Sequence, residues 1–433
     1  MADRGVAVHP FGRRRLRPGS ADGPAAGGHS MDPAPARFPG VGLAGTDRLP
    51  QGELGQRRVA AASGGRRRPA PRRVRRPGLP VRRRPERPMN HVLITSVHRI
   101  HTGQSGEAIH LRQLAEALRA AGERVTVLDG PMDPGRSSAG HEAALRSLAN
   151  QLDTLLARDR PDAALLWGHL GEETELVRRL AAANVPTVLE HPAADLPPVP
   201  ETLRLIDEVV VPSEFARRLF GSQTGRQAHA IEPCLRGCAC PSDPPRDPAR
   251  SGPYRLTFIN PEPAKGLGVV MHLVAATNGA KLPFRFRFVE GRWTAVDLAR
   301  LGIGPANLPG VQIVEYHADI CALYAETDLL LVPSLWQESF GMVAREAVIH
   351  GVPVVATRVG GLPQAVRDGG VCLEPPKWGN GYQVSMTAAE VRAWLAAVVT
   401  ALRGAHRPRP GLLSRATADS VRAYRAVLGS SSR

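Results

Sequence analysis

Short apolar runs alternate with amphipathic segments along most of the chain after residue 90. The first run occupies residues 91–97, and it precedes a segment whose apolar positions lie three or four residues apart as far as Gly122. A second run occupies residues 124–128. Such runs are typical of buried strands. The apolar positions of the segment between them have the spacing of one helix face. The pattern predicts a βαβ unit, the opening of a doubly wound α/β domain.

The alternation continues through the chain with one interruption. Further strands are expected at residues 163–167, 186–190, 254–260 and 329–332. A proline-rich stretch, residues 240–253, separates the second of these strands from the third, and we take it as a domain boundary. We therefore expect two Rossmann-like α/β domains, at residues 89–250 and 251–385.

The last part of the chain, residues 386–433, is expected to be helical. Thr387 and Glu390 have the spacing of a capping box, and apolar residues from Val421 to Val427 follow at helical intervals. Trp394 lies on the apolar face of the first of these helices. We expect its indole in the protein core and not at a ligand.

Residues 1–88 differ from the rest of the chain in charge. They hold 20 arginines and 6 acidic residues, which gives a net charge of +14 out of +16 for the whole chain. The arginine runs lie among prolines and glycines without an apolar period, which predicts disorder. Such a basic arm can bind nucleic acid. Phe11 and Phe38 are its only aromatic residues, however, so stacking on bases is not favoured.

A translation start at Met89 is our hypothesis for this basic segment. Met89 directly precedes the first expected strand, and the chain has 3 lysines against 53 arginines, as GC-rich coding DNA would produce. Peptide mapping of the native amino terminus tests the hypothesis. Abundant peptides from residues 40–80 would refute it.

A cytoplasmic location is expected because the apolar stretches are too short for a membrane span or a signal peptide. The chain has no apolar stretch of about 18 residues and no apolar signal-peptide stretch at its amino terminus. Cys234, Cys238 and Cys240 lie close together, but no fourth ligand stands at the spacing of the usual zinc sites. We therefore expect no structural metal.

The segment after the run at residues 329–332 holds the clearest candidate chemistry. A helix is expected to begin at the polar Glu338 and to continue to His350. Ligands of parallel sheets bind beyond the carboxyl ends of the strands, and N–H groups at a helix start favour an anion such as a diphosphate. Gly341 has no Cβ, so a ligand could approach the backbone closely there.

Glu338 and Glu346 allow two other interpretations. The pair could decorate an ordinary surface helix, or it could be the acid and nucleophile of a retaining glycosidase. The second role requires carboxyl groups about 5 Å apart, whereas eight residues of helix rise by about 12 Å. The spacing therefore argues against a hydrolase.

The order of residues in this segment resembles the donor-binding signature of the retaining GT-B glycosyltransferases of family 4. Their Glu-x7-Glu pattern with an internal Phe-Gly matches residues 338–346, and the match continues at residues 351–356, 360–363 and 368–370. The resemblance implies a GT-B fold, in which two Rossmann-like domains face each other across a cleft. It also implies that the helices of residues 386–433 cross back to the first domain.

The resemblance implies roles for individual residues of the second domain. Glu338 is expected beside the donor sugar as a catalytic residue, and Glu346 is expected at the ribose. The backbone of Phe340 and Gly341, with Met342 beside it, is expected at the sugar hydroxyls.

Lys265 is a further donor-binding candidate. It directly precedes Gly266 at an expected helix entrance, where an ammonium group can neutralise a phosphate. In the family that the chain resembles, an arginine stands five residues earlier, and this chain has Asn260 there.

The resemblance also implies site residues in the first domain. Gly103 and Gly106 match a glycine-rich loop that faces the donor diphosphate, and His110 is a matching position on the acceptor side. His191 resembles a histidine of the cleft and is expected to contact the donor sugar or the acceptor in catalysis. His169, which follows the neighbouring strand, is a second acceptor-side candidate, although a histidine at a strand end can equally be a hydrogen-bonded core group.

The expected function is transfer of a sugar, with retained configuration, from a UDP or GDP donor to an acceptor. Small metabolites, natural products and membrane lipids all remain acceptor candidates, because the loops expected to bind them, residues 131–139 and 193–199, carry no readable code. No cofactor or metal is expected, and the chain has no Asp-x-Asp motif. The alternatives are a sugar-nucleotide hydrolase or phosphorylase, nucleic-acid binding through the basic segment, and a catalytically weak scaffold, which Asn260 favours.

Overall fold

The computed structural model describes most of the chain after residue 89. The described residues are 90–103, 105–132, 141–171, 173–192, 198–235, 253–316, 320–379, 383–404 and 412–430. The predictions for residues 1–88, for Met89 and for Cys238 and Cys240 lie outside the described residues, as do those for most of the two expected acceptor loops.

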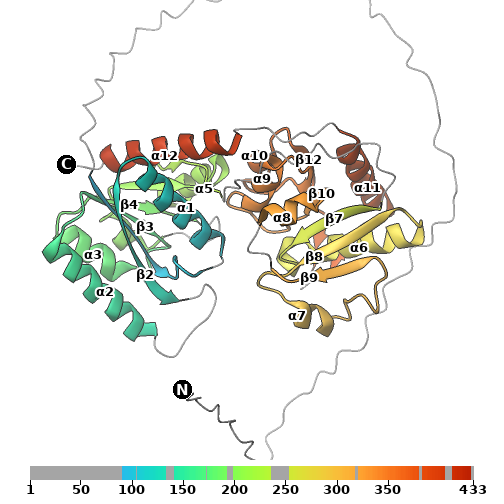
Figure 1. Cartoon of the computed structure of the whole chain (residues 1–433), viewed down its shortest axis with the longest axis horizontal. Helices are drawn as coiled ribbons and strands as arrows, with labels where there is room; N and C mark the ends of the chain where they lie inside the picture. Colours follow the sequence, from blue (N-terminus) through green and yellow to red (C-terminus); the bar gives the residue numbers. More distant parts are fainter. Residues whose placement is uncertain are drawn as a thin grey trace, which may run out of the picture. The chain divides into compact units, whose positions relative to one another are not determined.

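Six parallel strands form the first sheet, in the order β2-β1-β3-β4-β5-β6. Figure 1 labels β2, β3 and β4 of this sheet. The strands are β1 (His91–His98), β2 (Arg124–Met132), β3 (Ala163–Trp167), β4 (Thr187–Glu190), β5 (Glu208–Val211) and β6 (His229–Ala230). The helices between them are α1 (Gly106–Ala120), α2 (His141–Arg158), α3 (Thr174–Ala182), α4 (Pro200–Leu203) and α5 (Glu214–Thr224). The predicted βαβ opening is therefore confirmed.

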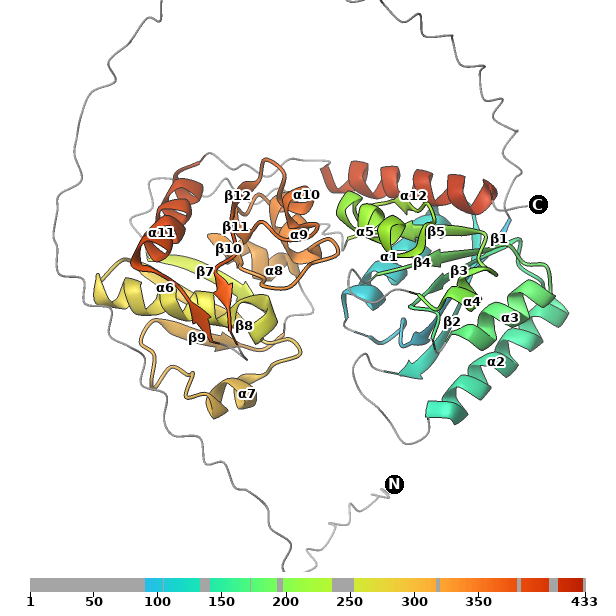
Figure 2. The same cartoon turned by 180° about the vertical axis from the view of Figure 1, so that it is seen from behind.

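Alternate residues of these strands build two apolar layers. Val92 and Ile94 of β1 pack with Leu114 of α1 and with Tyr424 of the last helix, α12 (Leu412–Ser430). Leu93 points the other way, into a second core cluster that includes residues of α2 and α3. Helices α2 and α3 run side by side on this face (Figure 2). Both faces of the sheet are covered, which explains why its strands are almost wholly apolar.

A second sheet of six parallel strands has the order β12-β11-β10-β7-β8-β9. Its strands are β7 (Tyr254–Ile259), β8 (Phe284–Val289), β9 (Val311–Val314), β10 (Leu329–Val332), β11 (Val354–Thr357) and β12 (Gly370–Leu373). A short antiparallel pair, β13 (Lys377–Trp378) and β14 (Val384–Ser385), follows. The helices are the 3-10 turn η1 (Pro263–Lys265), α6 (Leu267–Gly279), α7 (Ala295–Arg300), α8 (Ile320–Ala325), α9 (Met342–Ile349), α10 (Leu362–Val366) and α11 (Ala388–Arg403).

Helix α11 packs with α6 on one face of this sheet, and α8, α9 and α10 contribute to the core cluster of the other. The predicted capping box is confirmed, because Thr387 is the N-cap of α11 and exchanges hydrogen bonds with Glu390. Trp394 is 2% exposed in the core, as predicted.

The strand order reverses at one place in each sheet. In the second sheet the chain builds β7, β8 and β9 outward and then returns to place β10 on the other side of β7. In the first sheet the corresponding reversal lies between β1 and β3. Loops after the two strands at such a reversal diverge to opposite faces, and the crevice between them is where α/β sheets bind ligands.

The helix expected from Glu338 begins four residues later. Gly341, with φ 99°, is the N-cap of α9, and the helix itself starts at Met342 and ends at Ile349. The prediction was wrong because Glu338 caps no helix. Its backbone carbonyl instead accepts a 2.7 Å hydrogen bond from the N–H of Gly361, so the segment is a loop held by the next turn of the chain.

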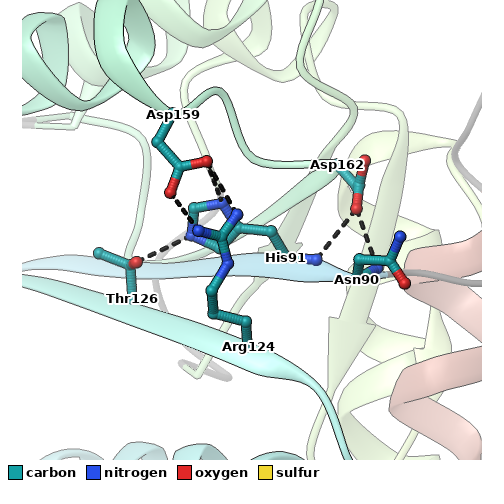
Figure 3. A network of polar contacts seen from close by, with 6 residues as sticks. All are labelled: Asn90, His91, Arg124, Thr126, Asp159 and Asp162. Carbon is teal, nitrogen blue, oxygen red and sulfur yellow. Dashed lines mark hydrogen bonds and ion pairs between the residues drawn. The ribbon is translucent and has the colours of Figure 1, made fainter.

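A polar network fixes the start of the first sheet (Figure 3). Asp162 accepts hydrogen bonds from the backbone N–H groups of Asn90 and His91, at 2.9 and 3.0 Å. The His91 ring lies 2.8 Å from the Thr126 hydroxyl of β2. Asp162 precedes β3, so one carboxylate joins the amino ends of neighbouring strands.

Asp162→Ala is expected to lower the free energy of unfolding by about 1–2 kcal/mol, because two backbone donors lose a charged acceptor. Arg124→Gln, which breaks the exposed pair with Asp159, should cost less than about 1 kcal/mol. Urea unfolding of both variants measures the difference. Equal losses would contradict the anchoring role of Asp162.

Among the described residues, no helix has both the length and the apolar character needed to span a bilayer.

Candidate active site

Lys265 and Glu338 meet at the strand-order reversal of the second sheet. Lys265 ends η1, the turn that follows β7, and Glu338 lies in the loop after β10, the strand next to β7. The Lys265 Nζ donates a 2.6 Å hydrogen bond to Glu338 Oε1. The structure therefore joins two residues that the sequence suggested separately, at the place where a ligand of this sheet would bind.

Glu338 is held as a buried carboxylate. Its residue is 9% exposed, and the Ser334 hydroxyl donates a second hydrogen bond of 2.6 Å to the same oxygen. Burial alone would raise the pKa of Glu338, but the charge of Lys265 and the hydrogen bonds from Lys265 and Ser334 hold the pKa below its ordinary 4.5. Glu338 is therefore ionised at neutral pH and accepts hydrogen bonds.

This pKa predicts a pH dependence of stability. A carboxylate whose pKa is lower in the folded state stabilises that state above its unfolded pKa of about 4.5 and loses the contribution as the pH falls through the folded value. The difference in free energy of unfolding between the native chain and Glu338→Gln should therefore shrink below pH 4.5. Urea titrations from pH 6 to pH 3 measure it. A difference that stays constant would contradict an ionised, paired Glu338.

Three glycines allow the two loops to pack closely. A Cβ at Gly266 would lie 2.0 Å from the carbonyl oxygen of Pro333, and one at Gly360 would lie 2.0 Å from that of Glu338. At Gly361 the nearest atom would be the Ser339 carbonyl oxygen, at 2.6 Å. The glycine next to Lys265 and the Gly-Gly turn thus have a common structural reason, which is to let backbone segments approach the Glu338 loop.

Trp336 is a residue of this site that sequence reasoning missed. Its ring centroid lies 4.7 Å from Lys265 Nζ, and the residue is 37% exposed. The ring therefore stacks against the ammonium group by a cation–π contact and limits where the lysine can move. In the sequence, its position two residues before Glu338 is the signal that could have identified it.

The other motif residues lie around the start of α9. Phe340 is 3% exposed and its ring is part of the core, while Met342 packs at the edge of the same cluster. A Cβ at Gly341 would lie 2.4 Å from Leu362 Cδ2, so on that side the glycine packs against α10. Glu346 is 2% exposed, with the Tyr324 hydroxyl 3.4 Å from its carboxylate. Their contacts with a donor stay predictions.

Asn260 has a conformational role. Its φ of 57° lies in the left-handed region, which asparagine tolerates better than most residues. Its amide donates a 2.7 Å hydrogen bond to Glu262, and its carbonyl accepts one of 2.9 Å from the backbone N–H of Arg292. The side chain therefore ties together the loops after β7 and β8.

In the first domain, the glycine-rich loop precedes α1. A Cβ at Gly103 would lie 2.2 Å from the carbonyl oxygen of Arg99, so the turn requires a glycine. Arg112 Nη1 donates to the carbonyl oxygens of Ile100 and Gly103, at 2.5 and 2.6 Å. Gly106 is the first residue of α1, and Ser105 caps the helix. The loop is braced at the strand-order reversal of its sheet, and its contact with a diphosphate stays a prediction.

His110 lies inside the first domain. Its Nδ1 accepts a 2.8 Å hydrogen bond from the backbone N–H of Cys234, and its Nε2 lies 2.8 Å from Glu190 and 3.2 Å from the Tyr424 hydroxyl. The residue is 3% exposed. These contacts join α1, β4 and α12, which is a packing role. The expected acceptor-side role stays a prediction.

His191 and His169 lie at the carboxyl ends of β4 and β3. The His191 Nδ1 is 3.3 Å from the carbonyl oxygen of Gly168, and its ring packs edge-on to that of His169, with centroids 5.3 Å apart. His191 is 1% exposed, and Phe220 adjoins its other side. The two histidines are thus brought together as expected of strand ends, while a catalytic role of His191 stays a prediction.

Glu107 and His98 form a pair that sequence reasoning also missed. Glu107 Oε1 accepts a 2.9 Å hydrogen bond from the Ser96 hydroxyl and lies 3.2 Å from His98 Nδ1. The His98 ring contacts that of Trp167, whose ring in turn contacts His169. A polar and aromatic group therefore lines the strand ends where this sheet reverses order. No group of three metal-ligating side chains occurs in the described parts of the chain.

Residues 258–403 match a protein-family model described as Glycosyl transferases group 1. This segment contains Lys265, Glu338 and Glu346. A D-inositol 3-phosphate glycosyltransferase of Mycobacterium tuberculosis is 45% identical over 102 residues, which make up 24% of this chain and 19% of that protein. The match thus spans about a fifth of the length of such curated relatives.

Solved structures show the fold over a longer part of the chain. The Anabaena protein HepE, in complex with UDP and glucose, matches with a TM-score of 0.54 at 16% identity, over 79% of this chain and 100% of that one. The catalytic domain of starch synthase IV from Arabidopsis thaliana, bound to ADP and acarbose, matches with a TM-score of 0.57 at 12% identity, over 79% and 99%. The predicted fold of two Rossmann-like domains, GT-B, is confirmed.

Proposed function

We propose that this chain, whose residues 258–403 match the model of the glycosyl transferases group 1 family, transfers a sugar from a nucleotide-diphosphate donor to an acceptor. One observation carries the proposal. Lys265 and the ionised Glu338 form a 2.6 Å pair at the strand-order reversal of the family-matched domain. This pair offers a cation for phosphate and an acceptor for hydroxyl groups at one point.

The chemistry follows from these two charges. When the bond between the sugar and the diphosphate breaks, negative charge grows on the departing phosphate oxygen, and a fixed ammonium group stabilises it. Lys265 supplies that group, and the backbone N–H groups at the start of α9 add a partial positive charge. Glu338 holds the sugar by accepting hydrogen bonds from its hydroxyls, which fixes the reacting carbon toward the acceptor.

The nucleotide, the stereochemistry and the acceptor are proposed from similarity to other proteins. UDP or GDP as the nucleotide and retention at the sugar carbon are carried over from the motif at residues 338–346. The UDP complex of HepE and the ADP complex of starch synthase IV support a nucleoside-diphosphate donor, and the name of the mycobacterial relative supports a small phosphorylated or hydroxylated acceptor. Activity without a metal ion or cofactor belongs to the same proposal.

A thermal-shift screen of the full chain over UDP-, GDP- and ADP-sugars tests the proposal. A donor at a hundred times its Kd should stabilise the fold by about 2.7 kcal/mol, because it binds the folded state alone. Lys265→Ala should abolish the shift at the same concentration. No stabilisation by any of these donors would contradict the proposal.

A further inference from the structure

Arg292 lies beside the candidate site and outside the signature of residues 338–346. We propose that Arg292, in the turn after β8, is a second cation that binds the diphosphate of the donor together with Lys265. This inference rests on the proposed function and names one more residue of its donor site.

The sheet places the Arg292 turn next to the Lys265 loop. Strands β7 and β8 are parallel neighbours, with Ile259 opposite Val289, so the segments that follow them leave the same edge of the sheet. Strand β10 flanks β7 on the other side. Neighbouring strands lie about 4.8 Å apart. The Glu338 loop, the Lys265 loop and the Arg292 turn therefore stand in a row along this edge.

The turn is fixed by its own contacts. The Asn260 side-chain oxygen accepts the backbone N–H of Arg292 at 2.9 Å, and a Cβ at Gly291 would lie 2.7 Å from that oxygen. The carboxylate of Glu290 accepts the N–H of Ala295 at 2.6 Å. Arg292 is thus carried by a braced turn, and Asn260 is the residue that positions it toward the Lys265 loop.

Arg292 and Lys265 are each paired with an acid on these loops. Arg292 Nη1 lies 3.6 Å from Glu262 Oε2, as Lys265 lies against Glu338. The side chain of Glu262 is 10% exposed, whereas that of Arg292 is 66% exposed. A guanidinium group has five N–H donors, so contact with one acid leaves donors that can reach a phosphate. Arg292 is accessible to a ligand while its charge is held at the edge.

A rival role is that Arg292 merely neutralises the buried Glu262. The two roles differ once Glu262 is also made neutral. If Arg292 only offsets Glu262, then Glu262→Gln in the Arg292→Gln background should restore nucleotide binding. If Arg292 binds phosphate, the double variant should bind as weakly as Arg292→Gln.

Calorimetric titration of the full chain with UDP, GDP and ADP, and with the matching monophosphates, tests the inference. For the diphosphate that binds the native chain, Arg292→Gln should raise the Kd about tenfold, as expected for one charged hydrogen-bond partner. The Kd of the monophosphate should change less than about twofold, and Arg292→Lys should recover part of the loss. Arg300→Gln is the matched control, because Arg300 is 72% exposed and pairs with Asp297 on nearby α7. Its Kd values should equal those of the native chain.

Three results would overturn the inference. The first is an unchanged diphosphate Kd in Arg292→Gln while Lys265→Ala loses binding, which would leave the proposed function intact. The second is an equal loss for diphosphate and monophosphate, or its recovery in the double variant with Glu262→Gln. The third is that none of the three diphosphates binds the native chain, in which case the proposed function fails as well.

Discussion

Replacing Glu338 by glutamine is expected to lower kcat/KM for the donor about a hundredfold, the scale on which a misplaced reacting group slows an enzyme. Glutamine keeps the shape of the side chain but removes the charge that pairs with Lys265 and accepts from Ser334. The variant should therefore bind the sugar hydroxyls more weakly and hold Lys265 less firmly in place. Release of nucleoside diphosphate from the donor that stabilises the native chain measures the effect.

Glu374→Gln is the control for this substitution. Glu374 belongs to the same domain, is 77% exposed and pairs with the exposed Arg358. Its removal should change kcat/KM less than about twofold, because exposed ion pairs contribute little. A Glu338→Gln variant as active as Glu374→Gln would contradict the role of Glu338 in the reaction.

Gly266→Ala is expected to lower the free energy of unfolding by about 3 kcal/mol and to abolish donor binding. Gly266 has φ +92°, and an added Cβ would lie 2.0 Å from the carbonyl oxygen of Pro333. The contacting atom belongs to backbone, so the Lys265 loop must move away from the loop that carries Glu338. Urea unfolding and calorimetric titration measure the two effects.

Gly302→Ala separates backbone strain from the clash. Gly302 has φ +71°, but a Cβ there would meet nothing within 4 Å. Its loss of stability should therefore be near 1 kcal/mol, the cost of a left-handed backbone for alanine, and donor binding should persist. If the two alanine variants lose equal stability and bind donor equally, close packing of the two loops does not shape the site.

The strands could be predicted because their sequences are simple. The run expected at residues 329–332 coincides with β10, and that at residues 163–167 coincides with β3. Strands in the middle of a parallel sheet are buried on both faces and so appear as uninterrupted apolar runs. The same simplicity located Trp394 in the core of the second domain.

The start of α9 could not be predicted from local sequence, because distant contacts determine it. Gly360 and Gly361 pack on the backbone from Glu338 to Phe340 and hold it as a loop. Gly341 then begins the helix in a left-handed conformation. A polar residue before an apolar stretch is normally a helix start, and here the tertiary contacts override that preference.

The residues of the candidate site could be chosen from the sequence only in part. Lys265 and Glu338 were both identified. They are 73 residues apart in the sequence, and their hydrogen bond depends on the adjacency of β7 and β10. Ser334, Trp336 and Arg292 lack a local signal and become visible through their neighbours. In the sequence, Asn260 stands where an arginine was expected. In the structure it has a positive φ and its side chain joins two loops.

A crystal structure of the full chain with the bound nucleotide sugar is the most direct test of the central claim. The account predicts phosphate oxygens within hydrogen-bond distance of Lys265 Nζ, with the carboxylate of Glu338 against a sugar hydroxyl. A nucleotide sugar bound elsewhere, with the Lys265–Glu338 pair unchanged, would contradict it.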